Sequence, residues 1–121
     1  VINDKNVARL RARLVVPGAN IATTPGAERY LFEHEVICVP DFIANAGGVI
    51  CAAVEYRGGS EAAAVAAIEE KIRDNTAAVL ERSRAEGVLP RAAAEDLALE
   101  RVHHAMAARR HHLFSAAPAF A

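Results

Sequence analysis

Two stretches of similar pattern decide the fold: residues 12–25 read ARLVVPGANIATTP, and residues 35–48 read EVICVPDFIANAGG. Each opens with a short apolar run, rich in β-branched residues and ended by a proline, as expected of a buried strand in a parallel sheet. Between them, Thr24 before Pro25 indicates the N-cap of a helix that runs to about His34. Strand, helix and strand in this order are typical of an α/β fold with a parallel sheet.

The rest of the chain predicts mostly helix. Ser60 can cap a long helix and Gly87 can end it, while Leu89 and Pro90 open another. The apolar positions at helical spacing are Val65, Ile68, Ile72, Val79 and Leu80 in the first helix and Ala94, Leu97, Ala98, Val102 and Met106 in the second. Residues 111–121 show no period and are expected to form a frayed or separately docked tail.

The predicted elements divide the chain into a strand–helix–strand part (1–58), C-terminal helices (59–110) and a tail (111–121). Two parallel strands are not a stable sheet by themselves, because both edges and one face stay exposed. The sequence also begins at Val1 rather than at a methionine. These features predict part of a larger domain whose other strands come from upstream sequence or from a partner chain.

The composition favours one globular domain. The 121 residues are 53% hydrophobic and 24% charged, with a formal net charge of −1. Interspersed charges leave no broad basic face, so neither nucleic acid nor an anionic membrane is expected as a partner. No apolar run has membrane-spanning length and no signal peptide is visible, which predicts a cytoplasmic protein. Cys38 and Cys51 are not a CxxC pair and are expected to be buried, reduced thiols.

Small and amide-bearing residues follow each predicted strand. Asn20 lies in the loop after the first strand, and Asn45, Gly47 and Gly48 follow the second. An asparagine amide both donates and accepts hydrogen bonds, and glycines let a ligand approach the backbone or a helix N-terminus. Either stretch alone is explained as well by turn geometry. Because open parallel sheets bind ligands at the carboxyl ends of their strands, the two together predict a ligand-binding crevice.

The segments GANIATTPGAERYL (18–31) and VPDFIANAGGVICAAVEY (39–56) resemble the C-terminal half of glutamate dehydrogenases and of their leucine, phenylalanine and valine relatives. In that family the motifs read close to GANGPTTPEA and VPDxxANAGGV. Both occur here in order and at the family's spacing, and the resemblance runs from about Asn3 to Arg110. It implies the C-terminal part of a Rossmann-like, parallel-sheet dinucleotide-binding domain, followed by long helices.

The resemblance also implies an activity: oxidative deamination of an L-amino acid to a 2-oxo acid and ammonia, with NAD or NADP as cofactor, in a homo-oligomer. By the resemblance, Asn20 contacts the nicotinamide end of the cofactor, and Asn45 lies where nicotinamide and substrate meet. Gly47 and Gly48 allow close approach of the backbone there. The family's GxGxxG turn, catalytic lysines and catalytic aspartate lie upstream, so no catalytic residue is assigned and the chain alone is expected to be inactive.

Ala52 departs from the glutamate-specific pattern. In those members a serine, seven residues after the motif asparagine, hydrogen-bonds the substrate's side-chain carboxylate, whereas a methyl group cannot donate. Losing such a bond costs about 1.5–3 kcal/mol. The alternatives are therefore a glutamate-type enzyme, a dehydrogenase for an apolar amino acid, and a non-catalytic remnant that acts by self-association or nucleotide binding. NAD and NADP are not distinguished, because the residue that reads the ribose lies upstream.

The C-terminal histidines and Asp41 are the other polar residues that could form a site. His103, His104, His111 and His112 contain no i,i+4 pair, and no cysteine or carboxylate completes a ligand set, so they predict solvated side chains and no metal site. Asp41 is expected to brace the loop after its strand, because turn aspartates commonly bond nearby backbone.

Overall fold

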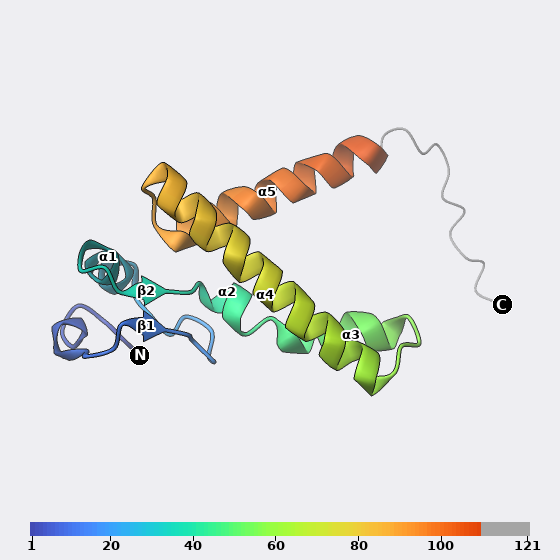
Figure 1. Cartoon of the computed structure of the whole chain (residues 1–121), viewed down its shortest axis with the longest axis horizontal. Helices are drawn as coiled ribbons and strands as arrows, with labels where there is room; N and C mark the ends of the chain where they lie inside the picture. Colours follow the sequence, from blue (N-terminus) through green and yellow to red (C-terminus); the bar gives the residue numbers. More distant parts are fainter. Residues whose placement is uncertain (110–121) are drawn as a thin grey trace.

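The computed structural model describes residues 1–109 and shows two short strands at one end of a longer helical part (Figure 1). Strand β1 (Leu14–Val15) pairs in parallel with β2 (Ile37–Cys38). The predicted strands are thus confirmed in place but are shorter than expected. No further strand pairs with either one in the described part, and the following prolines lack the N–H that a longer ladder needs.

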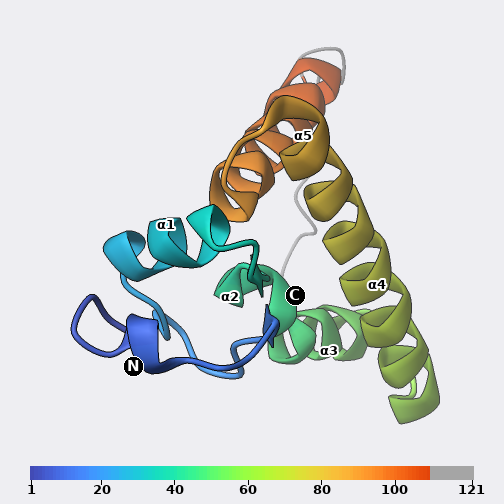
Figure 2. The same ribbon diagram turned by 60° about the vertical axis from the view of Figure 1, so that its left-hand side comes forward.

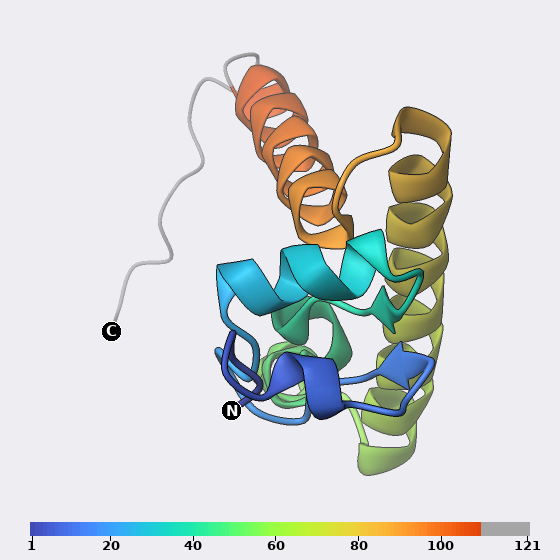
Figure 3. The same cartoon turned by 90° about the vertical axis from the view of Figure 1, so that its left-hand side faces the viewer.

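Helix α1 (Pro25–Glu33) connects the two strands and begins where the sequence predicts. The Thr24 hydroxyl accepts a hydrogen bond from the Ala27 N–H at 3.3 Å, which confirms the N-cap. Ala27 and Leu31 form its buried face and pack with Cys38 of β2 and with Val7 of the short 3-10 helix η1 (Val7–Arg9). Figure 3 shows α1 lying across the strand end of the molecule.

Two short helices follow β2. Helix α2 (Asp41–Ala44) occupies a segment that the sequence analysis treated as a loop, and Pro40 precedes its first turn. Helix α3 (Gly47–Tyr56) starts at Gly47, and no side chain caps its N-terminus. The chain changes direction twice after β2. The start of α3 therefore lies near the loop that follows β1.

Two long helices complete the described chain. Helix α4 (Glu61–Glu86) is capped by the Ser60 hydroxyl, which accepts from the Ala63 N–H at 3.3 Å, and it ends at Gly87 with a left-handed φ of +66°. Helix α5 is Pro90–Arg109. Figure 1 shows α3 beside the first half of α4, and it shows α5 starting near the end of α4 and then diverging from it. Figure 2 shows the start of α5 beside the end of α1. No helix in the part of the chain described is long and apolar enough to cross a membrane.

The apolar core has two parts. The first lies around α1 and β2; the second joins α4 and α5 through Val79, Ala93 and Ala94, with Ile43 of α2 packed against it. The predicted apolar face of α5 is buried only near its start, since Val102 and Met106 are more than half exposed where the helix diverges from α4. Val65, which was predicted to be a core residue of the first long helix, is exposed.

The two cysteines differ in burial. Cys38 is buried and Cys51 is half-buried, so the prediction of two buried thiols is right for Cys38 alone.

Candidate functional site

The loops after the two strands form one open groove. It has about 680 Å³ of space and is lined by residues 18–20 from the first loop and by Phe42, Asn45, Ala46, Gly48 and Val49 from the second. Because the strands are parallel, their carboxyl ends lie at the same edge of the sheet and bring the two loops together.

The two predicted asparagines meet in this groove. The Asn45 amide Nδ2 donates to Asn20 Oδ1 at 2.6 Å, although the residues are 25 positions apart. This bond uses one donor of Asn45 and one lone pair of Asn20. Within residues 1–109, the Asn20 amide nitrogen and the Asn45 amide oxygen make no other side-chain hydrogen bond, so the pair presents both a donor and an acceptor to the groove.

The other predicted site residues lie on α3 in different environments. Gly48 lines the groove, and a Cβ there would meet no atom within 4 Å. Gly47 instead faces Ile68 of α4, whose nearest carbon would lie 3.6 Å from a Cβ, so it adjoins the helix contact rather than the groove. Ala52 is exposed and lies outside the groove lining, one helical turn beyond Gly48.

Asp41 braces the first loop rather than the loop of its own strand. Its Oδ2 accepts a hydrogen bond from the Ile21 N–H at 2.6 Å, directly beside Asn20. The aspartate was expected to bond nearby backbone, yet its partner lies 20 residues away on the other loop. Ile21 itself has a left-handed φ of +52°, which is rare for a β-branched residue.

Arg91, at the start of α5, holds two nearly buried carboxylates. Its guanidinium donates to both oxygens of Glu28 at 2.7–3.0 Å and to Asp41 Oδ1 at 2.7 Å. It also lies 5.4 Å from the ring centre of Phe42, a groove residue. The role of Arg91 was not predicted from the sequence, because an arginine directly after a helix-opening proline is a weak signal and its partners are 50 and 63 positions away.

This network sets the charge state of Asp41. Burial raises the pKa of the carboxyl group, but the hydrogen bonds from the Ile21 N–H and from Arg91 outweigh it, so the pKa lies below its ordinary value of 3.8. The two carboxylates in turn raise the pKa of Arg91, chiefly through its hydrogen bonds to Glu28. Asp41 is therefore a carboxylate at neutral pH and accepts both bonds in its ionised form.

The sequence model of one protein family matches the whole described part of the chain. A family described as Glutamate/Leucine/Phenylalanine/Valine dehydrogenase matches residues 1–110. The chain belongs to this family. The resemblance drawn from the two motifs is thereby confirmed, and the groove is built from those same motifs.

Amino-acid dehydrogenases of several kinds are similar to the chain. An NADP(+)-dependent glutamate dehydrogenase of Pyrobaculum calidifontis is 42% identical over 116 residues, which cover 90% of this chain and 28% of the relative. A glutamate dehydrogenase of Aeropyrum pernix is 37% identical, with the same two coverages. A valine dehydrogenase of Streptomyces albus is also 37% identical and matches 89% of this chain and 30% of its own length. The chain thus spans less than a third of these dehydrogenases.

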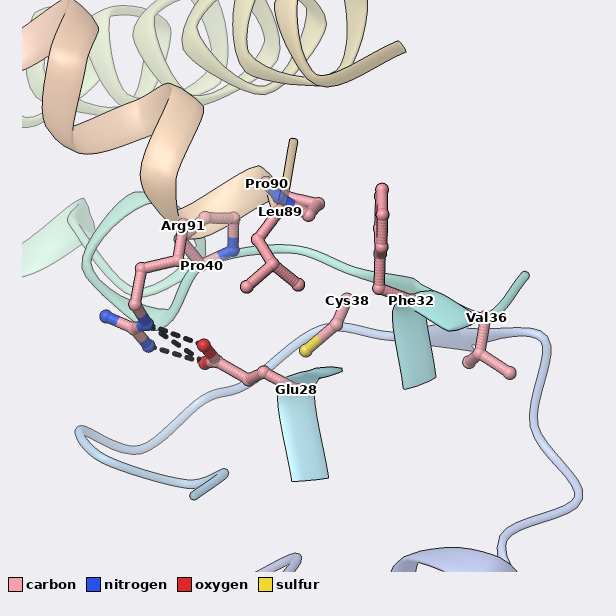
Figure 4. Close-up of a pocket in the computed structure, with 8 residues that line it drawn as sticks. All are labelled: Glu28, Phe32, Val36, Cys38, Pro40, Leu89, Pro90 and Arg91. Carbon is pink, nitrogen blue, oxygen red and sulfur yellow. Dashed lines mark hydrogen bonds and ion pairs between the residues drawn. The ribbon is translucent and has the colours of Figure 1, made fainter. Parts of the chain in front are cut away.

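A small cavity behind the groove is distinct from it. Figure 4 shows Arg91 and Glu28 facing each other across their hydrogen bonds, with Cys38 beside them and with Leu89 and Pro90 from the start of α5 above. The cavity has about 10 Å³, room for about one water molecule. Burial, followed by the nearby charge of Glu28, raises the pKa of the Cys38 thiol. A protonated, buried thiol is a packing residue and a poor nucleophile.

The histidines form no metal site in the part of the structure described. No group of three or more His, Cys, Asp or Glu side chains within residues 1–109 could hold a metal ion. His103 and His104 are exposed on α5. His111 and His112, like the predicted tail, lie outside the described residues.

Proposed function

We propose that the chain forms the nicotinamide side of an NAD(P) pocket in an L-amino-acid dehydrogenase that converts an amino acid to a 2-oxo acid and ammonia. The observation that carries the proposal is the Asn20–Asn45 pair across a groove at the carboxyl ends of parallel strands. In this proposal residues 1–58 belong to a Rossmann-like dinucleotide-binding domain, and the helices of residues 59–110 support it. Following the family resemblance, we place the enzyme in the cytoplasm as a homo-oligomer.

The groove fits the carboxamide of a nicotinamide ring. A carboxamide presents one carbonyl acceptor and one N–H₂ donor, and the bonded asparagine pair offers one donor and one acceptor in return. Exchanging the amide oxygen and nitrogen of both asparagines leaves the same donors and acceptors free, so the fit to a carboxamide is the same in either orientation. The open space beside Gly48 lets a flat ring approach the backbone at the start of α3.

Binding and orientation are the proposed tasks of these residues. The cofactor supplies the hydride chemistry when it is bound. Asn20 holds the carboxamide, and Asn45 adds a second polar contact on the side from which the substrate approaches. The name of the Pyrobaculum relative supports NADP, and the proposal includes both NAD and NADP.

The proposal includes two classes of substrate, an amino acid with an acidic side chain and one with an apolar side chain. A glutamate-type substrate is our leading proposal, because two of the similar proteins are glutamate dehydrogenases. An apolar amino acid is favoured by Ala52, an exposed methyl group one turn beyond Gly48 that cannot donate to a carboxylate, and by the similarity to valine dehydrogenases. Comparing kcat/KM for glutamate and valine in the full-length protein distinguishes the two, and restoring the hydroxyl with Ala52→Ser is expected to shift the ratio toward glutamate.

The asparagine pair is tested by Asn45→Ala in the full-length protein that contains this chain. Turnover is expected to fall at least tenfold and the Kd for the reduced cofactor, followed by its fluorescence, to rise. Asn75→Ala is the matched control, because Asn75 lies on α4, away from the groove, and its side-chain oxygen accepts from Arg101. Wild-type kinetics and affinity in Asn45→Ala would exclude the role proposed for the pair.

A further inference from the structure

We infer that Asp41 is a positioning residue that holds the Asn20 loop against Asn45, with Arg91 of α5 locking Asp41 in place. The inference rests on the proposed function of the groove, since it states how the asparagine pair is kept in register. Asp41 itself does not line the groove, and its role is exerted through its neighbours.

One aspartate contacts both halves of the site. Its carboxylate Oδ2 accepts from the Ile21 N–H at 2.6 Å, and its backbone oxygen accepts from the Asn45 N–H at 2.8 Å. Ile21 is covalently next to Asn20, so the Asp41 side chain is one residue from one asparagine and its carbonyl is bonded to the other. Asp41 therefore connects the two halves of the site by one side-chain bond and one backbone bond, in addition to the direct bond between the asparagines.

Little else holds the Asn20 end of the loop. Downstream, the loop is tied to Ile2, whose N–H bonds to the Ala22 oxygen and whose oxygen accepts from the Thr24 N–H. Within the described chain, residues 18–20 make no backbone hydrogen bond beyond those within strands and helices. The Ile21 side chain is 77% exposed, so burial does not offset the cost of its left-handed backbone. The charge-assisted bond to Asp41 is the contact that can stabilise this conformation.

Arg91 restrains the carboxylate that makes this bond. The Asp41 side chain is 8% exposed, and its second oxygen, Oδ1, is bonded to Arg91 at 2.7 Å. The three Arg91 bonds to Glu28 fix the plane of the guanidinium, and so the direction from which it meets Asp41. With Oδ1 held by Arg91, Oδ2 points at the first loop. The start of α5 is thereby coupled to the groove.

Hydrogen exchange in the full-length protein, without cofactor, tests the positioning directly. Asp41→Ala is expected to raise the exchange rate of the Ile21 amide roughly 10- to 100-fold, because its acceptor is removed. Asp41→Asn keeps an amide oxygen as acceptor and should recover part of the protection, which also covers the case in which Asp41→Ala does not fold. Ser60→Ala is the control: it removes the hydroxyl that caps α4 and lowers stability outside this network, and it should leave Ile21 exchange within about twofold of wild type. Ile21 exchange as slow as wild type in every Asp41 variant that folds, or equal rises in the Asp41 variants and Ser60→Ala, overturns the inference.

Cofactor affinity in a double-mutant cycle shows whether Asp41 acts through Asn20. Asp41→Asn and Asn20→Ala are each expected to weaken binding of the reduced cofactor roughly tenfold, and the double variant should bind no more weakly than Asn20→Ala alone. Additive losses would show that Asp41 acts on binding by another route and would overturn the positioning role. If Asn20→Ala leaves affinity unchanged, the proposed function fails, while exchange at Ile21 still decides whether Asp41 holds the loop.

Discussion

The groove and the α4–α5 hairpin are held together in different ways. The groove lies beside strands of two residues each, and its loops are held by side chains from distant parts of the chain, Asp41 on Ile21 and Asn45 on Asn20. The hairpin consists of long helices, the first of which carries its own end signals, Ser60 and Gly87. A site built on short strands thus depends on a few polar contacts, whereas a long helix depends mainly on local signals and packing. The two regions are in apolar contact where Ile43 packs against the α4–α5 core, and Arg91 joins them by polar bonds.

The largest effect is expected where the regions meet. Arg91→Met leaves the Glu28 and Asp41 carboxylates, 9% and 8% exposed, without their cation, and should lower the free energy of unfolding by about 3–5 kcal/mol. Denaturant unfolding of the full-length protein, with hydrogen exchange to locate the loss in α1, α2 and α5, measures it. Arg101→Met, on the same helix but with an exposed bond to Asn75, is the matched control and should cost less than about 0.5 kcal/mol. Equal losses of stability in the two variants would mean that the bonds of Arg91 to Glu28 and Asp41 contribute no more than an exposed bond does.

The stability of the groove region should depend on pH through the carboxylate of Asp41. The folded-state pKa of Asp41 is depressed, so its contribution is fully present above the ordinary value of 3.8 and is lost as the pH falls through the lower folded-state pKa. Asp41→Asn should therefore be less stable than wild type by about 1.5–3 kcal/mol at pH 6, with the gap narrowing below pH 3.8. Urea unfolding at a series of pH values measures the gap. A gap that stays constant down to pH 2 would contradict the assignment of the carboxylate.

Removing the N-cap of α4 should lower the free energy of unfolding less than the changes at Arg91 and Asp41 do. Ser60→Ala removes the hydroxyl that accepts from the Ala63 N–H and should destabilise the start of α4 by about 1 kcal/mol. Exchange should rise in the first turn of α4 and stay unchanged at Ile21. Ser60→Asp retains a capping acceptor and should behave like wild type. Faster amide exchange at Ile21 in Ser60→Ala would show that the stability of the groove depends on the start of α4.

The smallest effect is expected at Ile21 and Glu35, the two residues other than glycine with a left-handed φ within residues 1–109. Ile21→Gly should raise the free energy of unfolding by about 0.5–1 kcal/mol, because glycine adopts this φ without strain and the isoleucine side chain is 77% exposed. The family motif GANGPTTPEA has glycine at this position. Glu35→Gly, at φ +57° in the turn before β2, is the matched control and should give a similar gain without changing cofactor affinity. Destabilisation by Ile21→Gly would show that the isoleucine side chain contributes contacts that its exposure conceals.

The sequence by itself determined the helix boundaries marked by Thr24, Ser60 and Gly87, and it located both strands. These signals act within a few residues, since a cap bonds to the N–H three positions on and a proline ends a strand by its own geometry. The two strands also predicted that Asn20 and Asn45 lie in one crevice, because parallel strands bring their carboxyl ends together, and the two side chains are hydrogen-bonded in the structure.

Only the tertiary structure decided which contacts hold the site. Arg91 bonds to residues 50 and 63 positions away, and Asp41 reaches across 20, so no spacing pattern in the sequence records these pairs. Helix α2 and the exposed face of α5 were likewise set by packing, because periodicity shows that a helix has an apolar face but not whether another element covers it. Local bonding can be read from neighbouring residues, whereas the burial that gives a charged pair its weight depends on how the whole chain folds around it.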